Sequence, residues 1–280
     1  MVEETRSFDQ QTLTGGFNDT KKRLLRYILL HRGVCSHSSL LNALRALEQD
    51  EVADEVGGEV NERLDLILKD INVNLSKVGY SVLRCYDRYG DRCYAYIDVG
   101  QTAETKLATT FNADELEYVK WCIASFMKSG GIVHDVDDHG SRVRDAVDDI
   151  LERASSSSQR RLDKVVSYTE GSLHLCDYVA LGASRAEELL VKLCKLKWFY
   201  RTAGGRVGLD TRGVLELNEY LSREFETPQC CACVSTTLSG VICSCRRSAW
   251  HVACFQHTVV HLTQECAECG QSLLNAFYLD

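Results

Sequence analysis

The sequence predicts an α+β chain of two tandem modules, each with helices followed by a β-hairpin, and a short cysteine-rich module at the C-terminus. Apolar residues recur at helical spacing through most of the first 226 residues. Two pairs of β-branched and aromatic runs surround turn residues, one pair near residue 90 and the other near residue 204. Eight of the fourteen cysteines lie between Cys230 and Cys269.

A winged-helix domain, built from three helices and a hairpin, is predicted over residues 19–104. We expect residues 1–18 before it to be disordered or loosely ordered. The expected elements are helices over residues 21–32, from Ser36 or Ser38 to Leu47, and from Leu64 to Gly79, then strands over Tyr80–Tyr86 and Arg92–Val99. The turn Asp87-Arg88-Tyr89-Gly90-Asp91 gives the hairpin signal. Another small α+β domain is the alternative.

A second winged-helix domain is predicted over residues 105–226, because the same order of helices and hairpin repeats. Its expected elements are helices over Phe111–Met127, Leu173–Leu181, Ser184–Lys197 and Thr211–Phe225, with a wing formed by Trp198–Arg201 and Arg206–Leu209. Residues from about 130 to 169 are acidic and then serine-rich, which predicts an insertion, part helix around Val143–Leu151 and part loose linker. Pro228, the single proline, marks the boundary to the last module.

Basic residues on the helix Ser184–Lys197 and on its wing are placed where duplex DNA is read in helix-turn-helix proteins. They are Arg185, Lys192, Lys195, Lys197, Arg201 and Arg206. Glu187, Glu188 and a net charge of −8 oppose DNA binding. Winged helices also dock proteins, so we expect DNA contact to be indirect or weak.

Several function classes find no support in the sequence. No apolar stretch is long enough to cross a membrane. The sequence also has no GxSxG elbow, P-loop, GxGxxG after a strand or HExxH helix. The residues suited to site chemistry therefore concentrate at the C-terminus.

Four successive pairs with metal-ligand spacing stand in the C-terminal module. They are Cys230 with Cys233, Cys243 with Cys245, His251 with Cys254, and Cys266 with Cys269. A structural zinc ion takes four such ligands tetrahedrally, so eight ligands indicate two Zn²⁺ ions. A disulfide framework is disfavoured, because no apolar signal segment follows Met1 and the other six cysteines are scattered. Cys231 is left over.

The four pairs can bind two ions in series or as a cross-brace, in which the first pair joins the third and the second joins the fourth. We favour the cross-brace over residues 228–280, because Val241, Trp250 and Phe255 between the pairs suit one shared core. A module of this size cannot fold on apolar burial alone, so zinc is expected to supply most of its stability.

Seven cysteines and one histidine in this order resemble the RING and PHD class of zinc domains. In RING domains the class implies a platform for a ubiquitin-conjugating enzyme. The nearest apolar contact residues here are Ala232, Val234 and Val241. Four residues depart from the RING pattern, namely Ala232, Thr258, Ala267 and Gly270, where a bulky aliphatic, an aromatic, a proline and an arginine are usual. A zinc domain that only binds partners is therefore an open alternative.

Two winged helices followed by a RING-like zinc domain resemble the non-SMC element one family, the RING-like subunits of the Smc five/six genome-maintenance complex. The resemblance covers roughly Lys21 to Leu274. It rests on Arg23-Leu24-Leu25, His31-Arg32-Gly33-Val34, Ile71-Asn72-Val73-Asn74-Leu75, Ala108-Thr109-Thr110-Phe111, Asp114-Glu115-Leu116, and Lys197-Trp198 leading through Gly213-Val214-Leu215-Glu216-Leu217 to the zinc ligands. The 130–169 segment departs by its length.

The resemblance implies that the winged helices dock a MAGE-type partner, the third non-SMC element, and contact the kleisin, the fourth. It implies nuclear, chromatin-associated work in DNA repair and recombination, and RING-type E3 ubiquitin-protein transferase activity that is weak without the MAGE partner. Such a ligase needs no catalytic side chain, because it orients a ubiquitin thioester for attack by a lysine. A non-catalytic scaffold subunit and a winged-helix DNA-binding regulator are the alternatives.

Overall fold

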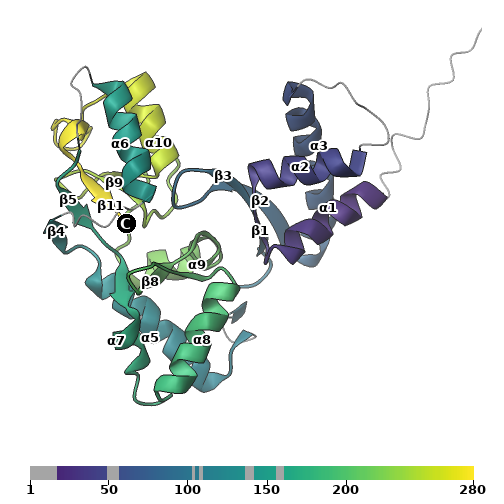
Figure 1. Cartoon of the computed structure of the whole chain (residues 1–280), viewed down its shortest axis with the longest axis horizontal. Coiled ribbons are helices and arrows are strands. Elements are labelled where there is room, and N and C mark those ends of the chain that lie inside the picture. The colour runs from purple at the N-terminus through teal and green to yellow at the C-terminus, as the bar shows by residue number, and fades with distance from the viewer. Residues whose placement is uncertain (1–17, 49–56, 103–104, 107–109, 136–141, 156–160) are drawn as a thin grey trace, which may run out of the picture.

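The chain forms three groups of elements (Figure 1), seen in a computed structural model that describes residues 18–48, 57–102, 105–106, 110–135, 142–155 and 161–280. The N-terminal group lies at the right of Figure 1, the second group below it, and the C-terminal group at the upper left. Within the described ranges, no helix combines the length and the apolar character that crossing a membrane requires.

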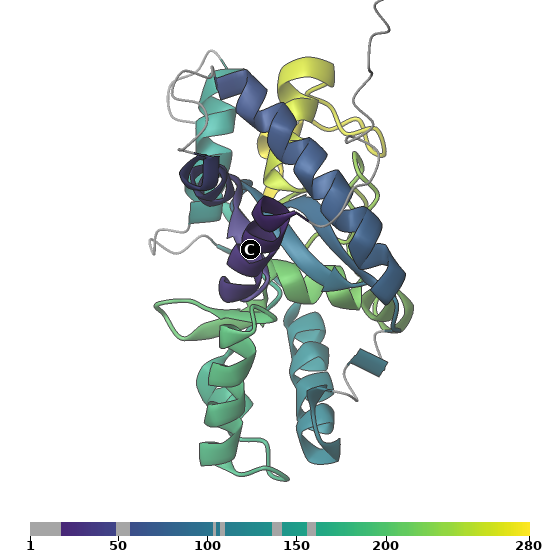
Figure 2. The same ribbon diagram turned by 90° about the vertical axis from the view of Figure 1, so that its right-hand side faces the viewer.

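The first group is a winged helix. Its elements are α1 (Asp19–Leu30), β1 (Val34–Ser36), α2 (His37–Glu48), α3 (Gly57–Leu75), η2 (Ser76–Val78), β2 (Tyr80–Tyr86) and β3 (Arg92–Asp98). The strands form an antiparallel sheet in the order β1-β3-β2, and α3 crosses in front of it in Figure 2. The Asn18 side chain accepts the hydrogen bond from the N–H of Lys21 that caps α1. Leu24, Leu44 and Leu64 are fully buried in the core between helices and sheet.

The second group repeats this arrangement. Its elements are α5 (Ala113–Ser129), β6 (Thr169–Gly171), α7 (Ser172–Cys176), α8 (Ala183–Lys195), β7 (Phe199–Arg201), β8 (Arg206–Leu209) and α9 (Thr211–Glu224). The sheet order is β6-β8-β7, and all of its pairs are antiparallel. Asp210 caps α9, and its side chain accepts from the N–H of Thr211. Tyr118, Phe126 and Phe199 are fully buried at the centre of this core.

The C-terminal group joins the last fifty residues to the segment predicted as an insertion. Its elements are β4 (Val133–Asp135), α6 (Arg142–Ala154), β5 (Lys164–Val166), β9 (Gly240–Ile242), β10 (Ala249–Trp250), α10 (Val252–His257), the π-helical turn η3 (Thr258–Leu262), η4 (Leu273–Asn275) and β11 (Phe277–Leu279). They form one five-stranded sheet in the order β10-β9-β11-β5-β4. The pair β11–β5 is parallel, and the others are antiparallel.

The 130–169 segment therefore belongs to the C-terminal core instead of extending from the second winged helix as a loose insertion. Val143, Val147 and Leu151 of α6 are fully buried and pack in one cluster with Trp250 and Phe255. This spacing places the apolar residues on one helix face. The helix expected around Val143–Leu151 is confirmed. The serine run continues into residues 156–160, outside the described part of the chain.

The β2–β3 hairpin of the first winged helix is docked on the other two groups (Figure 1). Arg88 forms an ion pair with Asp280, and its guanidinium carbon lies 3.4 Å from the centroid of the Tyr200 ring. A Cβ added to Gly90, which has φ +88°, would meet Val252 at 2.9 Å. The tip of this wing is therefore held against both other groups.

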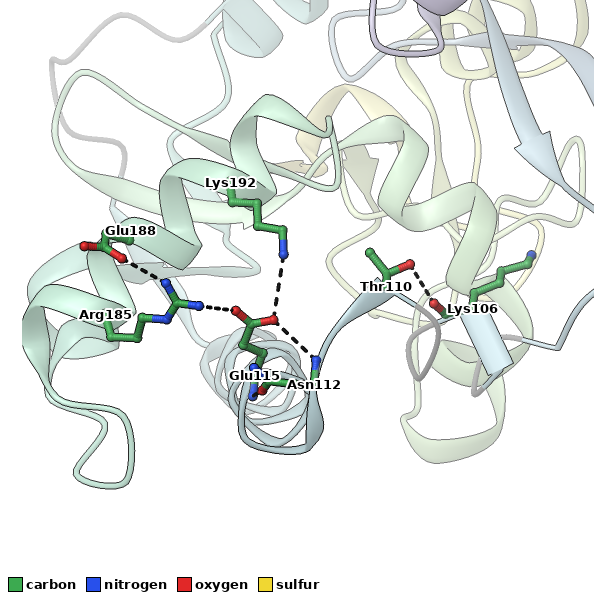
Figure 3. Close-up of polar contacts among 7 residues, drawn as sticks. All are labelled: Lys106, Thr110, Asn112, Glu115, Arg185, Glu188 and Lys192. Carbon is green, nitrogen blue, oxygen red and sulfur yellow. Dashed lines mark hydrogen bonds and ion pairs between the residues drawn. The ribbon is translucent and has the colours of Figure 1, made fainter.

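Most basic residues predicted for DNA contact are paired within the protein, as Figure 3 shows for α8. Glu115 is 6% exposed and accepts from Arg185 at 2.7 Å, and Lys192 lies 3.7 Å away. Arg201 pairs with Glu187 at 2.6 Å, and Arg206 donates to Thr169. Glu115 also completes a capping box with Asn112 at the start of α5. These contacts leave α8 and its wing poorly suited to bind phosphates.

Replacing Arg88 with alanine should release the docked hairpin. Removing one member of a buried, desolvated pair typically costs about 3–5 kcal/mol, and Arg88 is 11% exposed in its side chain. Arg142→Ala is the matched control, because Arg142 also pairs with an aspartate and stacks on a tyrosine but is 67% exposed. Its cost should stay below about 1 kcal/mol. Urea unfolding measures the loss of stability, and amide hydrogen exchange at residues 87–91 measures release of the hairpin. Equal effects of the two variants would contradict a stabilising role of the buried Arg88 pair.

Replacing Glu115 with glutamine should destabilise the second winged helix by about 2–3 kcal/mol, because two cations lose their buried partner. Glu188→Gln is the control, since Glu188 pairs with Arg185 on the exposed face of α8. Thermal unfolding of the two variants provides the comparison. A Glu115→Gln protein as stable as Glu188→Gln would show that the buried cluster does not stabilise this group.

Candidate metal centres

The eight predicted ligands come together as two groups of four. Their ligand atoms lie within 4.8 Å of one another in each group. The first centre holds Cys230, Cys233, His251 and Cys254, and the second holds Cys243, Cys245, Cys266 and Cys269. The first pair thus joins the third and the second joins the fourth, which is the grouping that a cross-brace requires.

Three of the four pairs lie in turns that a backbone hydrogen bond closes, between residues four apart at Cys230 and Cys266 and three apart at Cys243. The backbone N–H of Val234 donates to the carbonyl of Cys230, that of Arg246 to Cys243, and that of Gly270 to Cys266, each at 2.8 Å. The donor residue follows the second cysteine and has a positive φ, between 61° and 70°. This left-handed residue closes the turn so that both sulfur atoms of a pair face the same point. Glycine adopts this left-handed backbone conformation freely, whereas the β-branched Val234 adopts it at a cost in energy.

His251 and Cys254 are positioned by a helix. His251 is the N-cap residue of α10, and its carbonyl accepts from the N–H of Phe255 at 2.8 Å. Its Nδ1 lies 3.4 Å from Cys233 Sγ, while its Nε2 lies 3.2 Å from the carbonyl oxygen of Thr236. Donation from Nε2 to this carbonyl leaves Nδ1 unprotonated and turned toward the sulfur atoms, which is the usual outer-sphere arrangement of a metal-binding histidine.

The distances fit tetrahedral zinc. Two sulfur atoms on one such ion, each bonded at about 2.3 Å, lie about 3.8 Å apart. In the second centre, Cys243 and Cys269 are 3.6 Å apart, and Cys245 and Cys266 are 4.0 Å apart. Cys266 Sγ donates to Ser248 Oγ at 3.2 Å. The donor set of four thiolates, or three with one imidazole, is typical of structural zinc sites.

Thiols this close together compete for protons. The hydrogen bond from Cys254 lowers the pKa of Cys230 to about 3, and the same interaction raises the pKa of Cys254 far above its usual value. A divalent cation at the centre of the group would allow both to ionise, because it replaces the proton as the neutralising charge.

Both centres border one apolar core. Val241 in β9 lies between the ligands of the first and second centres along the chain and is fully buried. It shares its cluster with Trp250, Phe255, Tyr278 and the buried face of α6. The α6 contribution was not anticipated as part of the site, although its helical apolar spacing was visible in the sequence.

The three predicted contact residues do not form one surface. Ala232 and Val234 are exposed in the first turn, Val234 to 73%. Val241, by contrast, is 0% exposed and pairs with Tyr278 and Trp250 inside the sheet. The prediction of Val241 as a contact residue is therefore wrong, because β9 is paired along both edges and the Val241 side chain is buried in the shared core.

The residues that depart from the RING pattern have different surroundings. Thr258 is 6% exposed, and its hydroxyl donates to the carbonyl of Cys254 at 2.9 Å. Ala267 and Gly270 are exposed beside the second centre. Thr258 thus stabilises the transition from α10 to the π-helical turn, and the other two leave the second centre without a bulky side chain next to it.

A cavity of about 460 Å³ separates the first centre from the winged helices. Its lining includes His251 and Cys254 of the first centre, Cys85 of β2, Tyr200 of β7 and Val214 of α9. All three groups of elements therefore meet around this space.

Comparison with known proteins agrees with this architecture. The family model described as "Nse1 non-SMC component of SMC5-6 complex" matches residues 21–217. A curated relative, "Non-structural maintenance of chromosomes element 1" from Saccharomyces cerevisiae (strain ATCC 204508 / S288c), is 32% identical, with 91% of this chain and 93% of the relative covered.

A chain of a solved structure, "Nse1-Nse3-Nse4 complex", has a similar fold, with a TM-score of 0.60 at 17% identity over 91% of this chain and 96% of that one. The family model covers more than half of the chain, and the yeast relative matches almost its full length. The chain therefore belongs to the Nse1 family of non-SMC components of the SMC5-6 complex.

Proposed function

We propose that this protein is a zinc-binding, RING-like subunit of an SMC5-6 complex that docks Nse3-type and Nse4-type partners and acts as a ubiquitin ligase. The interleaved grouping of eight ligands is the observation that carries the proposal. Family membership supplies the complex. Work in DNA repair and recombination on nuclear chromatin follows from membership of that complex.

Each centre is proposed to hold one Zn²⁺ ion. Residues Cys230, Cys233, Cys254 and Nδ1 of His251 would bind the first, and the four cysteines of the second centre would bind the other. The donor atoms and their spacing support this choice. When bound, zinc would neutralise the thiolates and fix the turns that carry them.

Partner docking is proposed for the two winged helices. The similar fold comes from a solved Nse1-Nse3-Nse4 complex, and MAGE-type Nse3 and the kleisin Nse4 are the partners proposed here. Large apolar side chains stand exposed on both domains, among them Leu30, Leu66, Val73, Leu173 and Val179. Exposed apolar groups of this kind favour protein contacts, while the internal pairing of Arg185, Lys192, Arg201 and Arg206 disfavours direct DNA contact.

Ligase activity would arise from orientation. The exposed turn with Ala232 and Val234 would contact a ubiquitin-conjugating enzyme and hold its ubiquitin thioester for attack by a substrate lysine. No side chain of this protein needs to exchange a proton in that step. The MAGE-type partner is proposed to raise the activity by holding the subunit in its assembled state.

A non-catalytic scaffold is the second candidate. The wing of the first domain docks against Val252 and Asp280, and the first centre borders the cavity between the three groups. The zinc-binding region thus serves to hold the domains together, which is a structural role that requires no conjugating enzyme. Exposed Ala267 and Gly270 also leave little apolar contact surface next to the second centre.

Zinc analysis of the Cys230→Ser and Cys231→Ser proteins should show that Cys230 is a zinc ligand and that the adjacent Cys231 is not. Cys230 is 1% exposed in the first centre, whereas Cys231 is exposed and outside both groups. We expect two Zn²⁺ per chain for the unchanged protein and for Cys231→Ser, and fewer than two for Cys230→Ser. Atomic absorption after dialysis gives the count. Loss of zinc from Cys231→Ser but not from Cys230→Ser would show that Cys231, and not Cys230, is the ligand.

The same Cys230→Ser variant should leave the winged helices and their partner contact mostly intact, because their cores consist almost entirely of residues outside the cluster that holds the ligands, although Leu238 packs into the core of the second winged helix. Hydrogen exchange should rise in α6 and α10 but not in α8. Complete loss of binding to the MAGE-type partner would contradict this separation.

Val234→Gly tests the ligase contact without breaking the turn. Glycine relieves the positive φ at this position, so the zinc-binding region should be at least as stable. Loss of the valine contact, worth about 1.4 kcal/mol, should weaken ubiquitin transfer about tenfold. Val99→Gly is the control, an exposed valine outside the zinc-binding region. Autoubiquitination with the MAGE-type partner and a panel of conjugating enzymes is the assay.

The outcomes of that assay distinguish the two candidates. Activity that falls in Val234→Gly and persists in Val99→Gly supports the ligase. No transfer by the unchanged protein with any conjugating enzyme favours the scaffold. Unchanged activity in Val234→Gly would remove this turn from the contact surface.

A further inference from the structure

Two cysteines outside the metal centres face each other across the hairpin of the first winged helix. Cys85 in β2 and Cys93 in β3 are direct partners in the antiparallel register. Their Sγ atoms lie 3.2 Å apart. Directly opposed residues of antiparallel strands have Cα atoms about 4.5–5.5 Å apart, a spacing that falls in the range that a disulfide needs, about 4.4–6.8 Å. A bond between the two sulfur atoms therefore requires little backbone movement.

The two thiols differ in access. Cys85 is partly exposed and lines the 460 Å³ cavity between the three groups of elements. Cys93 is 3% exposed beneath the sheet. A small oxidant that enters the cavity would meet Cys85 first, while Cys93 is protected from it and lies in contact with the sulfur that reacts.

The hairpin that carries the pair is also the docked wing. Arg88, three residues after Cys85, forms the ion pair with Asp280 and stacks on Tyr200. On the other side of the pair, the side chain of Asn72 holds Val82 through two hydrogen bonds, at 2.7 and 2.9 Å. A covalent link at Cys85 and Cys93 would thus join the strands between the domain core and the docked tip.

We propose that Cys85 and Cys93 form a reversible disulfide, with a peroxide as the oxidant. The Cys85 thiolate attacks one peroxide oxygen, the O–O bond breaks, and Cys85 becomes a sulfenic acid while a hydroxide or alkoxide leaves and takes up a proton. Cys93 then attacks the Cys85 sulfur, the S–O bond breaks, and water leaves. The two thiols together lose two electrons, and the peroxide accepts these two electrons.

The bond would stiffen the wing. Oxidation shortens the distance between the two sulfur atoms from 3.2 Å to about 2.05 Å, and the strands can no longer separate at this point. Opening of the hairpin tip, which would expose Arg88 and the cavity, should become rarer in the oxidised protein. The site thereby responds to the redox state at the junction of the three groups.

Peptide mapping of the full, zinc-loaded chain tests the proposal. The protein is treated with increasing hydrogen peroxide, its free thiols are alkylated in denaturant without reductant, and zinc release is followed in parallel. Trypsin cleaves after Arg84, Arg88 and Arg92, so the two cysteines fall on separate peptides. We expect these peptides to be recovered linked, with a loss of 2 Da, while zinc is retained, and to separate on addition of dithiothreitol.

Two variants give the controls. Cys93→Ser should abolish the link and leave a Cys85 sulfenic acid that dimedone traps, whereas Cys35→Ser, which changes another buried thiol of the same domain, should keep the link. If Cys93→Ser fails to fold, Cys85→Ala serves in its place and should leave Cys93 unoxidised. Recovery of Cys85 and Cys93 as separately alkylated thiols, or release of zinc before any link forms, would overturn the proposal.

Discussion

The interleaving of eight ligands is the constraint on which the C-terminal half of the molecule depends. The first centre takes the first and third ligand pairs, and the second centre takes the second and fourth. Strands β9 and β10 therefore lie in the chain between ligands of different centres. Such a fold has no room for two independent cores, and a single cluster around Trp250 and Phe255 serves both centres. Fifty residues cannot enclose that cluster alone. Helix α6 and strand β5, from the middle of the chain, complete it.

This arrangement ties the two halves of the chain together. Because β5 lies in one sheet with β11, the chain passes from the second winged helix into the C-terminal core and back again. The wing of the first winged helix then docks on the assembled unit through Arg88. The winged helices therefore function as parts of a fixed scaffold. Internal ion pairs at Glu115 and Glu187 further divert their basic residues from nucleic acid, which agrees with docking of proteins.

Local patterns in the sequence were sufficient to place most of the helices, the hairpin turns and the four ligand pairs. Two helices differ in length, because α7 ends at Cys176 instead of Leu181 and α3 begins at Gly57 instead of Leu64. The C-terminal sheet was not predictable in this way, because its strands have two or three residues each and show no usable periodicity. Val165 pairs with Tyr278, and no local signal links positions so far apart. The sequence predicts Val241 both for the shared core and as a contact residue, and no local signal separates these two positions. The core position is confirmed, because β9 is paired along both edges, with β10 and with β11, and the Val241 side chain is 0% exposed.

Zinc retention in a protein altered at α6 tests the central claim most directly, namely that the middle of the chain and the eight ligands form one folding unit. Val147 is 0% exposed and ligates nothing. A buried aspartate there should disrupt the shared core. We expect Val147→Asp to lose zinc to a chromogenic chelator far faster than the unchanged protein, whereas Asp149→Ala, on the exposed face of α6, should not. Equal zinc retention in Val147→Asp and the unchanged protein would contradict it.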